Sequence, residues 1–279
     1  MMSSSSAFDS SLIIDVGAYD GSDTAYYLHC GYRVVAIEAN PDLAVQVERR
    51  FQPEVADGRL QVLNVGISDQ AGESDFWISE TNDQWGSLSK LVATRRGAKV
   101  RQRPVRVHCL RLSDVLHGVG TPYYLKMDIE GNDAVGLESL TRDIAPQYIS
   151  VEFAHGMERR LLEDLEALGY CRFKLLNQIT FTDKRPVFND EIGFRVMRKV
   201  SRKIPPLRPL IRTVAHRSDF DDFQAKHDWR FPEGSSGPFG EETYGRWANA
   251  NEILDRFKRL RREYDKAGQV FWWDLHATA

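Results

Sequence analysis

The chain has 279 residues, of which 42% are hydrophobic and 28% are charged, and its formal net charge is −3. This length allows one large domain or two small ones, and the nearly balanced charge argues against a nucleic-acid-binding protein. Three cysteines, Cys30, Cys109 and Cys171, lie far apart without metal-ligand spacing, which argues against a disulfide framework or a zinc site and fits a reducing cytoplasm. Residues 1–11 are serine-rich, with neither a basic nor a long apolar stretch, so we expect a disordered start rather than a signal peptide or a membrane span.

The first predicted element is a buried strand over residues 12–16, whose apolar run contains a single acid, Asp15. Gly17 and Gly21 follow in a short loop, and a helix is expected over residues 22–30. Glycine lets a loop turn sharply and lets a ligand approach the backbone closely. The helix N-terminus then offers unpaired N–H groups and the positive end of the helix dipole. This is the pattern of the first β-α unit of a nucleotide-binding α/β domain.

The second predicted strand, residues 32–37, ends at Glu38. An acid at this strand end is placed to accept hydrogen bonds from the two hydroxyls of a ribose. A dinucleotide-binding loop requires Gly-x-Gly-x-x-Gly, but Tyr19 stands where the second of those glycines belongs. The loop and the acid together predict an adenosine-type ligand, and Tyr19 disfavours a dinucleotide.

A second helix is expected from Asn40, as its N-cap, and Pro41, at the first helical position. Residues 60–67 are predicted to form the third strand of the sheet. In a doubly wound sheet the end of this strand lies beside the first two, so we expect its loop, with Ile67 and Ser68, to close over the adenine.

Residues 72–107 do not follow a simple β-α rhythm. A short strand is expected over residues 75–79, and the polar, aromatic stretch 82–88 favours an insertion over the ligand pocket, because long irregular loops in compact domains are usually functional. Six basic residues follow without an intervening acid, and they suit either a solvated basic loop or an anion-binding role. They are Arg95, Arg96, Lys99, Arg101, Arg103 and Arg106.

The fourth and fifth predicted strands, residues 123–128 and 148–153, both end in polar groups. Ligands bind at the carboxyl ends of the strands in open α/β sheets, so acids and a histidine at those ends are candidate site residues. These residues are Asp128, Glu130, Glu152 and His155.

A helix over residues 158–168, stopped at Gly169, and a sixth strand over residues 171–181 continue the alternation expected of a parallel sheet. Residues 186–268 are predicted to form a cap that shapes the acceptor site, with a basic arm at 198–217 and an amphipathic helix at 251–266. The segment 269–279 is expected to return to the sheet as its last strand. A separate small C-terminal domain is the alternative, which the short terminal strand disfavours because one strand alone needs a sheet to join. Four aromatic residues suit either a sugar platform or the core. They are Trp229, Phe231, Trp272 and Trp273.

Several of these segments together resemble the FkbM family of S-adenosylmethionine (AdoMet)-dependent methyltransferases, over roughly residues 12–178. The segments are 15–21, with the spacing Asp-x-Gly-x-x-x-Gly, then 38–41, 64–69, 126–131, with Lys-x-Asp-x-Glu-Gly, and 150–152. The resemblance implies a class I methyltransferase fold: an α/β, doubly wound, mostly parallel, Rossmann-like sheet of seven strands with an antiparallel last strand. It also implies AdoMet as cofactor and methylation of a hydroxyl of a sugar, a glycan or a secondary metabolite.

We expect residues 12–185 to form the AdoMet-binding domain. By the resemblance, Asp15 and the glycine loop hold the methionine part and Glu38 holds the ribose. The expected cofactor-binding residues are Asp15, Gly17, Ala18, Tyr19, Gly21, Glu38, Ala39, Ile67, Ser68 and Asp128.

Methylation of a hydroxyl requires removal of one proton, and the candidate bases are Asp128, His155, Glu152 and Glu130, in that order. A divalent cation on Asp128 and Glu152 would serve as well, although two acids without a third ligand make a metal the weaker interpretation. Two other functions stay open: a nicotinamide-dependent oxidoreductase, and a non-catalytic protein that binds AdoMet or uses its basic arm to hold an anionic glycan or a membrane surface.

Overall fold

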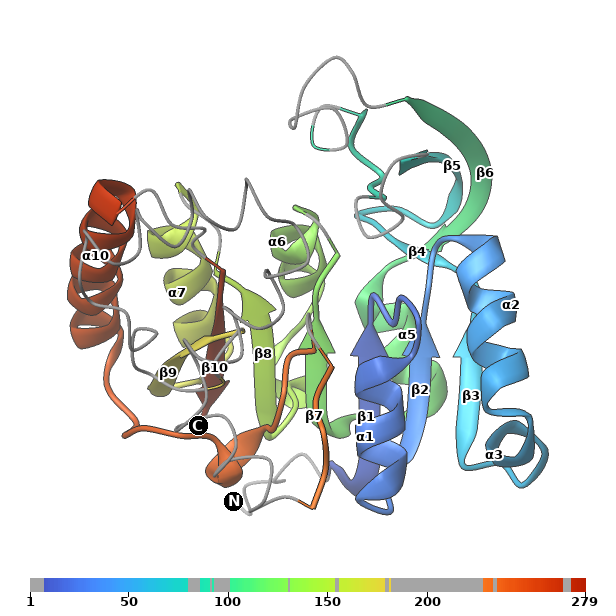
Figure 1. The fold of residues 1–279 in the computed structure, drawn as a ribbon, viewed down its shortest axis with the longest axis horizontal. Helices are drawn as coiled ribbons and strands as arrows, with labels where there is room; N and C mark the ends of the chain where they lie inside the picture. The colour runs from blue at the N-terminus through green and yellow to red at the C-terminus, as the bar shows by residue number, and fades with distance from the viewer. Residues whose placement is uncertain are drawn as a thin grey trace, which may run out of the picture. The chain divides into compact units, whose positions relative to one another are not determined.

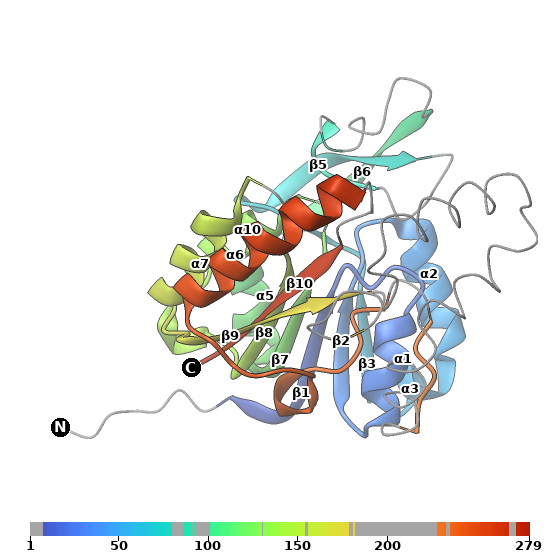
Figure 2. The ribbon, with the colours of Figure 1, turned by 60° about the vertical axis from the view of Figure 1, so that its left-hand side comes forward.

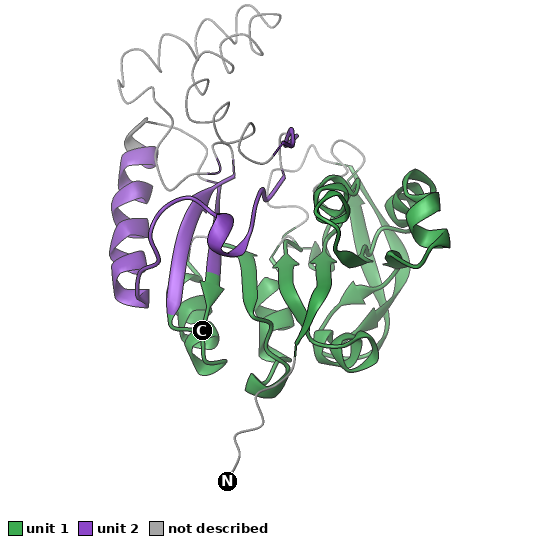
Figure 3. Ribbon diagram, turned by 90° about the horizontal axis from the view of Figure 1, so that it is seen from below, with its two compact units in different colours: residues 1–171, 277–279 green, residues 172–276 purple. Residues whose placement is uncertain are grey.

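The computed structural model describes residues 8–79, 86–90, 92, 101–129, 131–153, 156–178, 181, 228–232, 235–267 and 272–279. The chain divides into two compact units, which Figure 3 shows in different colours. Unit 1 comprises residues 1–171 and 277–279, and unit 2 comprises residues 172–276.

The described strands include a seven-stranded sheet in the order β3-β2-β1-β7-β8-β10-β9 (Figure 1). Its strands are β1 (Asp9–Val16), β2 (Arg33–Ile37), β3 (Leu60–Leu63), β7 (Pro122–Met127), β8 (Tyr148–Glu152), β9 (Arg172–Asn177) and β10 (Trp273–Thr278). In unit 1, β1 pairs in parallel with β2 and β7, β2 with β3, and β7 with β8. The chain runs outward from β1 to β3 on one side and then continues from β7 on the other side of β1. This strand order is that of the predicted doubly wound sheet.

The last strand, β10, runs antiparallel to β9. The N–H of Cys171 donates to the carbonyl of Thr278 at one end, and the N–H of Gln178 donates to the carbonyl of Trp272 at the other. Because the residue numbers of the two partners run in opposite directions, the chain directions are opposed. The antiparallel last strand implied by the family resemblance is therefore confirmed.

The helices of unit 1 cover both faces of its strands. Figure 2 shows α1, α2 and α3 on one side of these strands and α5, α6 and α7 on the other. The helices among the described residues are α1 (Ser22–His29), α2 (Pro41–Arg50), α3 (Gln52–Ala56), α5 (Leu112–Val119), α6 (Asp133–Glu138), α7 (Glu158–Ala167) and α10 (Ala250–Ala267), with 3-10 turns at Arg142–Ile144 and Gly240–Glu242.

Local sequence explains where these elements begin. The side chain of Asn40 accepts a hydrogen bond from the N–H of Asp42, and Pro41 occupies the first turn of α2, as predicted.

The expectation of disorder over residues 1–11 is wrong for residues 9–11, which belong to β1. Asp9 anchors the start of this strand, because its N–H donates to the carbonyl of Thr121 and its carboxylate pairs with Arg33 at 2.9 Å.

The prediction of one strand over residues 60–67 is also wrong. β3 ends at Leu63, and β4 (Gly66–Ile67) belongs to a second, three-stranded sheet in the order β4-β6-β5. The side-chain amide of Asn64 donates to the carbonyls of Glu38 and Ala39, at 2.8 and 3.2 Å, and so draws the chain out of the main sheet. The other strands of this second sheet are β5 (Gly72–Ser79) and β6 (Gln102–Leu110), which pair antiparallel.

The small sheet has one apolar face, formed by a cluster of Phe76, Ile78, Val107 and Cys109, and Ala39 packs against this cluster. The residue directly after Glu38 therefore anchors the small sheet to the end of β2. In Figure 1 the small sheet lies beyond the carboxyl ends of β1 to β3.

Strand β6 carries part of the basic stretch 95–106: Arg106 lies on the face opposite the apolar cluster, and Arg103 lies opposite Ile78 at the end of the apolar face. Arg106 pairs with Asp75 at 3.1 Å, and Arg103 pairs with Asp42 of α2 at 2.8 Å. Both arginines are exposed, and their partners come from segments distant in sequence. Arg95, Arg96 and Lys99 lie outside the described residues.

In unit 2, α10 buries one apolar face, as its spacing predicts, and the ring of Tyr264 meets that of Trp273 at 6.1 Å. Trp273 and Phe231 are 1% and 3% exposed, which assigns these two aromatic residues to the core rather than to a sugar platform. The basic arm at 198–217 lies outside the described residues. None of the helices in the described part of the chain is both long and apolar enough to span a membrane.

Candidate active site

The strand register places several predicted site residues in one row. Across β2, β1, β7 and β8 the last paired residues are Ile37, Val16, Met127 and Val151. The next residue on each strand is Glu38, Gly17, Asp128 and Glu152, and neighbouring strands lie about 4.8 Å apart. We call these four residues the edge row. Three carboxylates thus flank one glycine at the carboxyl edge of the sheet, where ligands bind in this class of fold.

Gly17 is required at its position by two features of the backbone. Its φ is +79°, in the left-handed region, and a Cβ added to it would lie 2.0 Å from the carbonyl oxygen of Asp128. The loop therefore passes against the backbone of β7 more closely than any side chain would permit. Gly21 closes the same loop with a φ of +77°, and its Cβ position lies 2.7 Å from the ring of Phe51.

Glu38 is almost completely buried, at 7% exposure, and its carboxylate is held by the backbone. One oxygen accepts from the N–H of Tyr19 and the other from the N–H of Asn40, both at 2.8 Å. Burial raises the pKa of Glu38 to about 7, although the two N–H groups and the charge of Lys126 oppose this shift. A carboxylate has about four acceptor positions, so this one can still accept from two further donors such as ribose hydroxyls.

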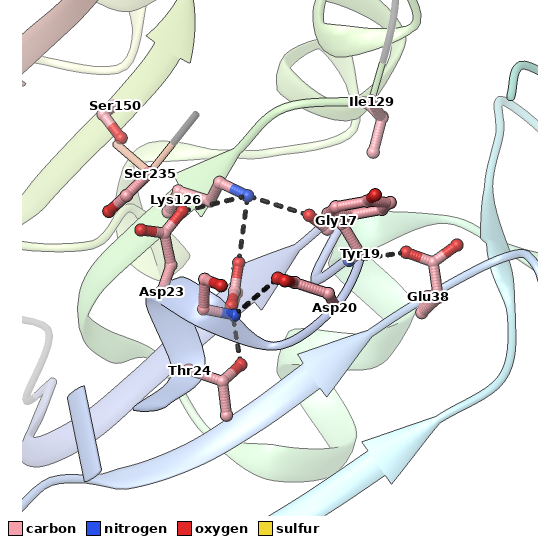
Figure 4. Close-up of polar contacts among 12 residues, drawn as sticks. Gly17, Tyr19, Asp20, Asp23, Thr24, Glu38, Lys126, Ile129, Ser150 and Ser235 are labelled. Carbon is pink, nitrogen blue, oxygen red and sulfur yellow. Dashed lines mark hydrogen bonds and ion pairs between the residues drawn. The ribbon is translucent and has the colours of Figure 1, made fainter. Parts of the chain in front are cut away.

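A buried lysine ties the loop to the strand beneath it (Figure 4). The Lys126 amine on β7 donates to the carbonyl of Gly17 at 2.8 Å and lies 3.2 Å from the Asp15 carboxylate and 3.7 Å from that of Asp23. The second oxygen of Asp15 accepts from the hydroxyl of Thr24 at 2.7 Å. One strand end, one loop and the first turn of α1 are thereby fastened together.

Burial alone would lower the pKa of Lys126, but attraction to Asp15, Asp23 and Asp128 outweighs burial and raises that pKa well above its usual value. The lysine is therefore charged at all physiological pH values. Asp15 itself is 0% exposed. Its carboxylate is engaged with Thr24 and Lys126, which suits a residue that holds the loop in place from below.

Asp128 is half-buried, and a second acid organises the loop that follows it. Asp133 accepts a hydrogen bond from the N–H of Ile129 at 3.3 Å and is 5% exposed. Burial and the nearby charge of Asp128 raise the pKa of Asp133 to about 7. Asp133 was not among the site residues predicted from the sequence, where its one signal is that it follows Asp128 and Glu130 as a further acid.

The residues expected near the adenine fall in the small sheet. Ile67 is buried in β4, and the N–H of Ser68 donates to the carbonyl of Leu110 at 3.0 Å. Their contact with an adenine stays a prediction.

Part of the predicted insertion packs against the loops at the strand ends. A Cβ on Gly66 would lie 3.3 Å from the side chain of Leu88, and one on Gly131 would lie 3.1 Å from that of Val92. Residues 88 and 92 therefore touch the chain after β3 and the loop after Asp128, which agrees with a segment that covers this edge of the sheet.

Two candidate bases, Glu130 and His155, lie outside the described residues. Within the described ranges, no three His, Cys, Asp or Glu side chains are grouped so that they could hold a metal ion. A cation on Asp128 and Glu152 stays the weaker prediction that the sequence made.

Comparison with known proteins places this site in a family. The sequence model of the methyltransferase FkbM domain matches residues 15–175. A probable ribosomal RNA small subunit methyltransferase A of Haloarcula marismortui is 32% identical over 83 residues, which is 30% of this chain and 29% of that protein. The match thus spans less than a third of the relative's length.

Similar solved structures include two SAM-dependent methyltransferases in complex with S-adenosyl-L-homocysteine. The one from Geobacter sulfurreducens is 12% identical with a TM-score of 0.37, and the one from Thiobacillus denitrificans is 9% identical with a TM-score of 0.36. Each similarity covers 98% of this chain and 86% of the other. Because the family model matches more than half of the residues, the chain belongs to the FkbM family of AdoMet-dependent methyltransferases.

Proposed function

We propose that this protein transfers the methyl group of AdoMet to a hydroxyl of a sugar, a glycan or a secondary metabolite. The observation that carries the proposal is the edge row, in which a backbone-held carboxylate, Glu38, and a half-buried one, Asp128, flank the closely packed Gly17. The first suits recognition of a ribose and the second suits removal of a proton.

The described residues fit AdoMet in this place. Glu38 keeps acceptor positions for the ribose hydroxyls, and the absence of a side chain at Gly17 lets a ligand approach the loop backbone. When bound, AdoMet supplies a methyl group on a positively charged sulfur, which an oxygen nucleophile takes up by in-line displacement. The three carboxylates of the edge row suit a cofactor with cationic groups.

Within this site Asp128 accepts the proton of the acceptor hydroxyl. It stands beside Gly17 in the row, it is half-buried and so remains within reach of a substrate, and its backbone N–H is fixed to the carbonyl of Val16 at 3.0 Å. A positioned base contributes roughly 10²- to 10⁴-fold to such a reaction. Glu152, the next residue in the row, is placed to orient the acceptor by hydrogen bonding.

The test compares Asp128→Asn with Asp114→Asn, a control in an exposed acid on α5. Transfer of labelled methyl from AdoMet is measured against a panel of sugars, glycans and hydroxylated metabolites, with amines and carbon nucleophiles included for comparison, and AdoMet affinity is measured separately. We expect Asp128→Asn to lower the turnover number about 10²- to 10⁴-fold with little change in AdoMet affinity, and the control to behave as wild type. Full turnover by Asp128→Asn would remove Asp128 from the role of base. Methylation confined to nitrogen or carbon acceptors would contradict the proposed reaction.

A further inference from the structure

The backbone of Tyr19 is unusual for a large side chain. Its φ is +52°, and the glycines on either side of it, Gly17 and Gly21, also have positive φ. In this left-handed region the Cβ of an L-residue crowds the neighbouring carbonyl, which glycine avoids. A glycine would satisfy the backbone at position 19 more easily than tyrosine does. Residues strained in this way cluster at ligand-binding sites, where the side chain supplies an interaction that offsets the strain.

The ring is half-buried rather than part of the core. The N–H of Tyr19 is fixed to the Glu38 carboxylate at 2.8 Å, so the residue is tied to the proposed ribose site by its backbone. Figure 4 shows the ring between Ile129, which follows Asp128, and Glu38.

The proposed function indicates which part of AdoMet would lie near the Tyr19 ring. Glu38 and Asp128 belong to strands on either side of β1, so they stand about 10 Å apart across the edge row. The sulfur of AdoMet is one carbon beyond its ribose ring, and the methyl group has to face the acceptor oxygen at Asp128. With its ribose on Glu38 and its methyl group toward Asp128, AdoMet would place its charged sulfur between these two residues, near Gly17 and the loop that carries Tyr19.

We propose that the ring of Tyr19 binds the sulfonium centre of AdoMet through a cation–π interaction and makes the site discriminate AdoMet from S-adenosylhomocysteine. This inference rests on the proposed function. A sulfonium carries a permanent charge and no hydrogen-bond donor, so an aromatic face suits it as it suits a quaternary ammonium group. S-adenosylhomocysteine keeps the ribose and the adenine but has a neutral sulfur.

The experiment measures calorimetric affinities for AdoMet and S-adenosylhomocysteine with wild type, Tyr19→Phe and Tyr19→Asn. Asparagine tolerates the left-handed backbone and keeps the N–H that Glu38 accepts, whereas phenylalanine keeps the ring. We expect Tyr19→Asn to weaken AdoMet binding about 3- to 30-fold and to leave S-adenosylhomocysteine binding unchanged. Tyr19→Phe should retain the preference of wild type. Tyr19→Gly, which relieves the backbone strain, serves as a second ring deletion with the same expected result.

Equal weakening of both ligands in the ring deletions, or unchanged AdoMet affinity, would overturn the role of Tyr19 and leave the proposed function standing. Failure of wild type to bind either ligand would overturn the proposed function and this inference with it. Thermal unfolding of each variant establishes that the compared proteins are folded.

Discussion

At the scale of single residues, the protonation of Glu38 controls the proposed ribose site. Burial raises the pKa of Glu38 from 4.5 to about 7, with two backbone N–H groups and Lys126 acting in the opposite direction and Asp15 in the same one. A ribose hydroxyl donates its hydrogen bond best to the ionised carboxylate. Below pH 7 the ligand-free protein holds a proton on Glu38 that binding has to expel.

AdoMet affinity should therefore rise with pH between 6 and 8. About nine-tenths of Glu38 is protonated one pH unit below its pKa, so we expect roughly tenfold weaker binding at pH 6 than at pH 8, with release of a proton. Titration calorimetry in buffers of different ionisation enthalpy measures both quantities. Glu38→Gln should bind weakly at every pH.

Asp133→Asn is the matched control, because Asp133 also has a pKa of about 7. This variant should keep the pH dependence of AdoMet binding. A flat affinity profile in wild type, or one abolished in Asp133→Asn but kept in Glu38→Gln, would contradict the assignment of the ribose site to Glu38.

At the scale of elements, the Lys126 network joins β7, β1 and α1 through charges that water does not reach. The side chains of Lys126, Asp15 and Asp23 are 5%, 0% and 8% exposed. Breaking a buried ion pair by removing one partner leaves the other charge desolvated, which costs far more than the pair itself contributes.

Lys126→Met should lower the free energy of unfolding by about 3 to 5 kcal/mol, and adding Asp15→Asn should recover part of that loss. Urea denaturation measures both variants. Arg106→Met, which breaks the exposed pair with Asp75, should cost less than about 1 kcal/mol. Equal effects of Lys126→Met and Arg106→Met would show that the buried network does not hold these elements together.

The loop at Gly17 makes a second prediction at this scale. Gly17→Ala combines a left-handed φ with a Cβ placed 2.0 Å from the Asp128 carbonyl, so we expect destabilisation on the order of 3 to 5 kcal/mol and loss of AdoMet binding. Gly118→Ala is the control, since Gly118 lies in α5 with open space around it. It should be neutral or stabilising by up to about 1 kcal/mol. If Gly17→Ala were as stable as wild type, the loop could move away from the Asp128 carbonyl on β7 at little cost, which would contradict the close packing described for this site.

The arrangement of the main elements followed from local patterns that the fold preserves. Apolar runs with an acid at or near their ends predicted β1, β2, β7 and β8, because buried parallel strands need continuous apolar sequence. The ends of β2, β7 and β8 differ from the prediction by one residue, whereas β1 begins three residues earlier than predicted. The division of residues 60–67 between two sheets was not predictable from these patterns. It depends on Asn64, whose amide reaches the carbonyls of Glu38 and Ala39 from a distant part of the chain.

At the scale of the whole molecule, some residues of the site could be predicted from local sequence, and others depend on contacts between distant segments. Residues at strand ends, such as Glu38 and Asp128, could be grouped from sequence because parallel strands bring their carboxyl ends to one edge. The partners of Lys126 could not be predicted from the sequence, because they depend on the register of β7 against β1, which pairs Lys126 with Asp15. The strain at Tyr19 could not be predicted either, because it comes from a positive φ that the residue type does not reveal.

The central claim, that this fold and its edge row hold AdoMet, is tested most directly by calorimetric titration of the purified protein with AdoMet and, in parallel, with NAD. Wild type and Glu38→Ala are compared. We predict saturable AdoMet binding that is lost on removal of Glu38, and no binding of NAD. Absence of AdoMet binding by well-folded wild type, or binding of NAD in its place, would contradict the account.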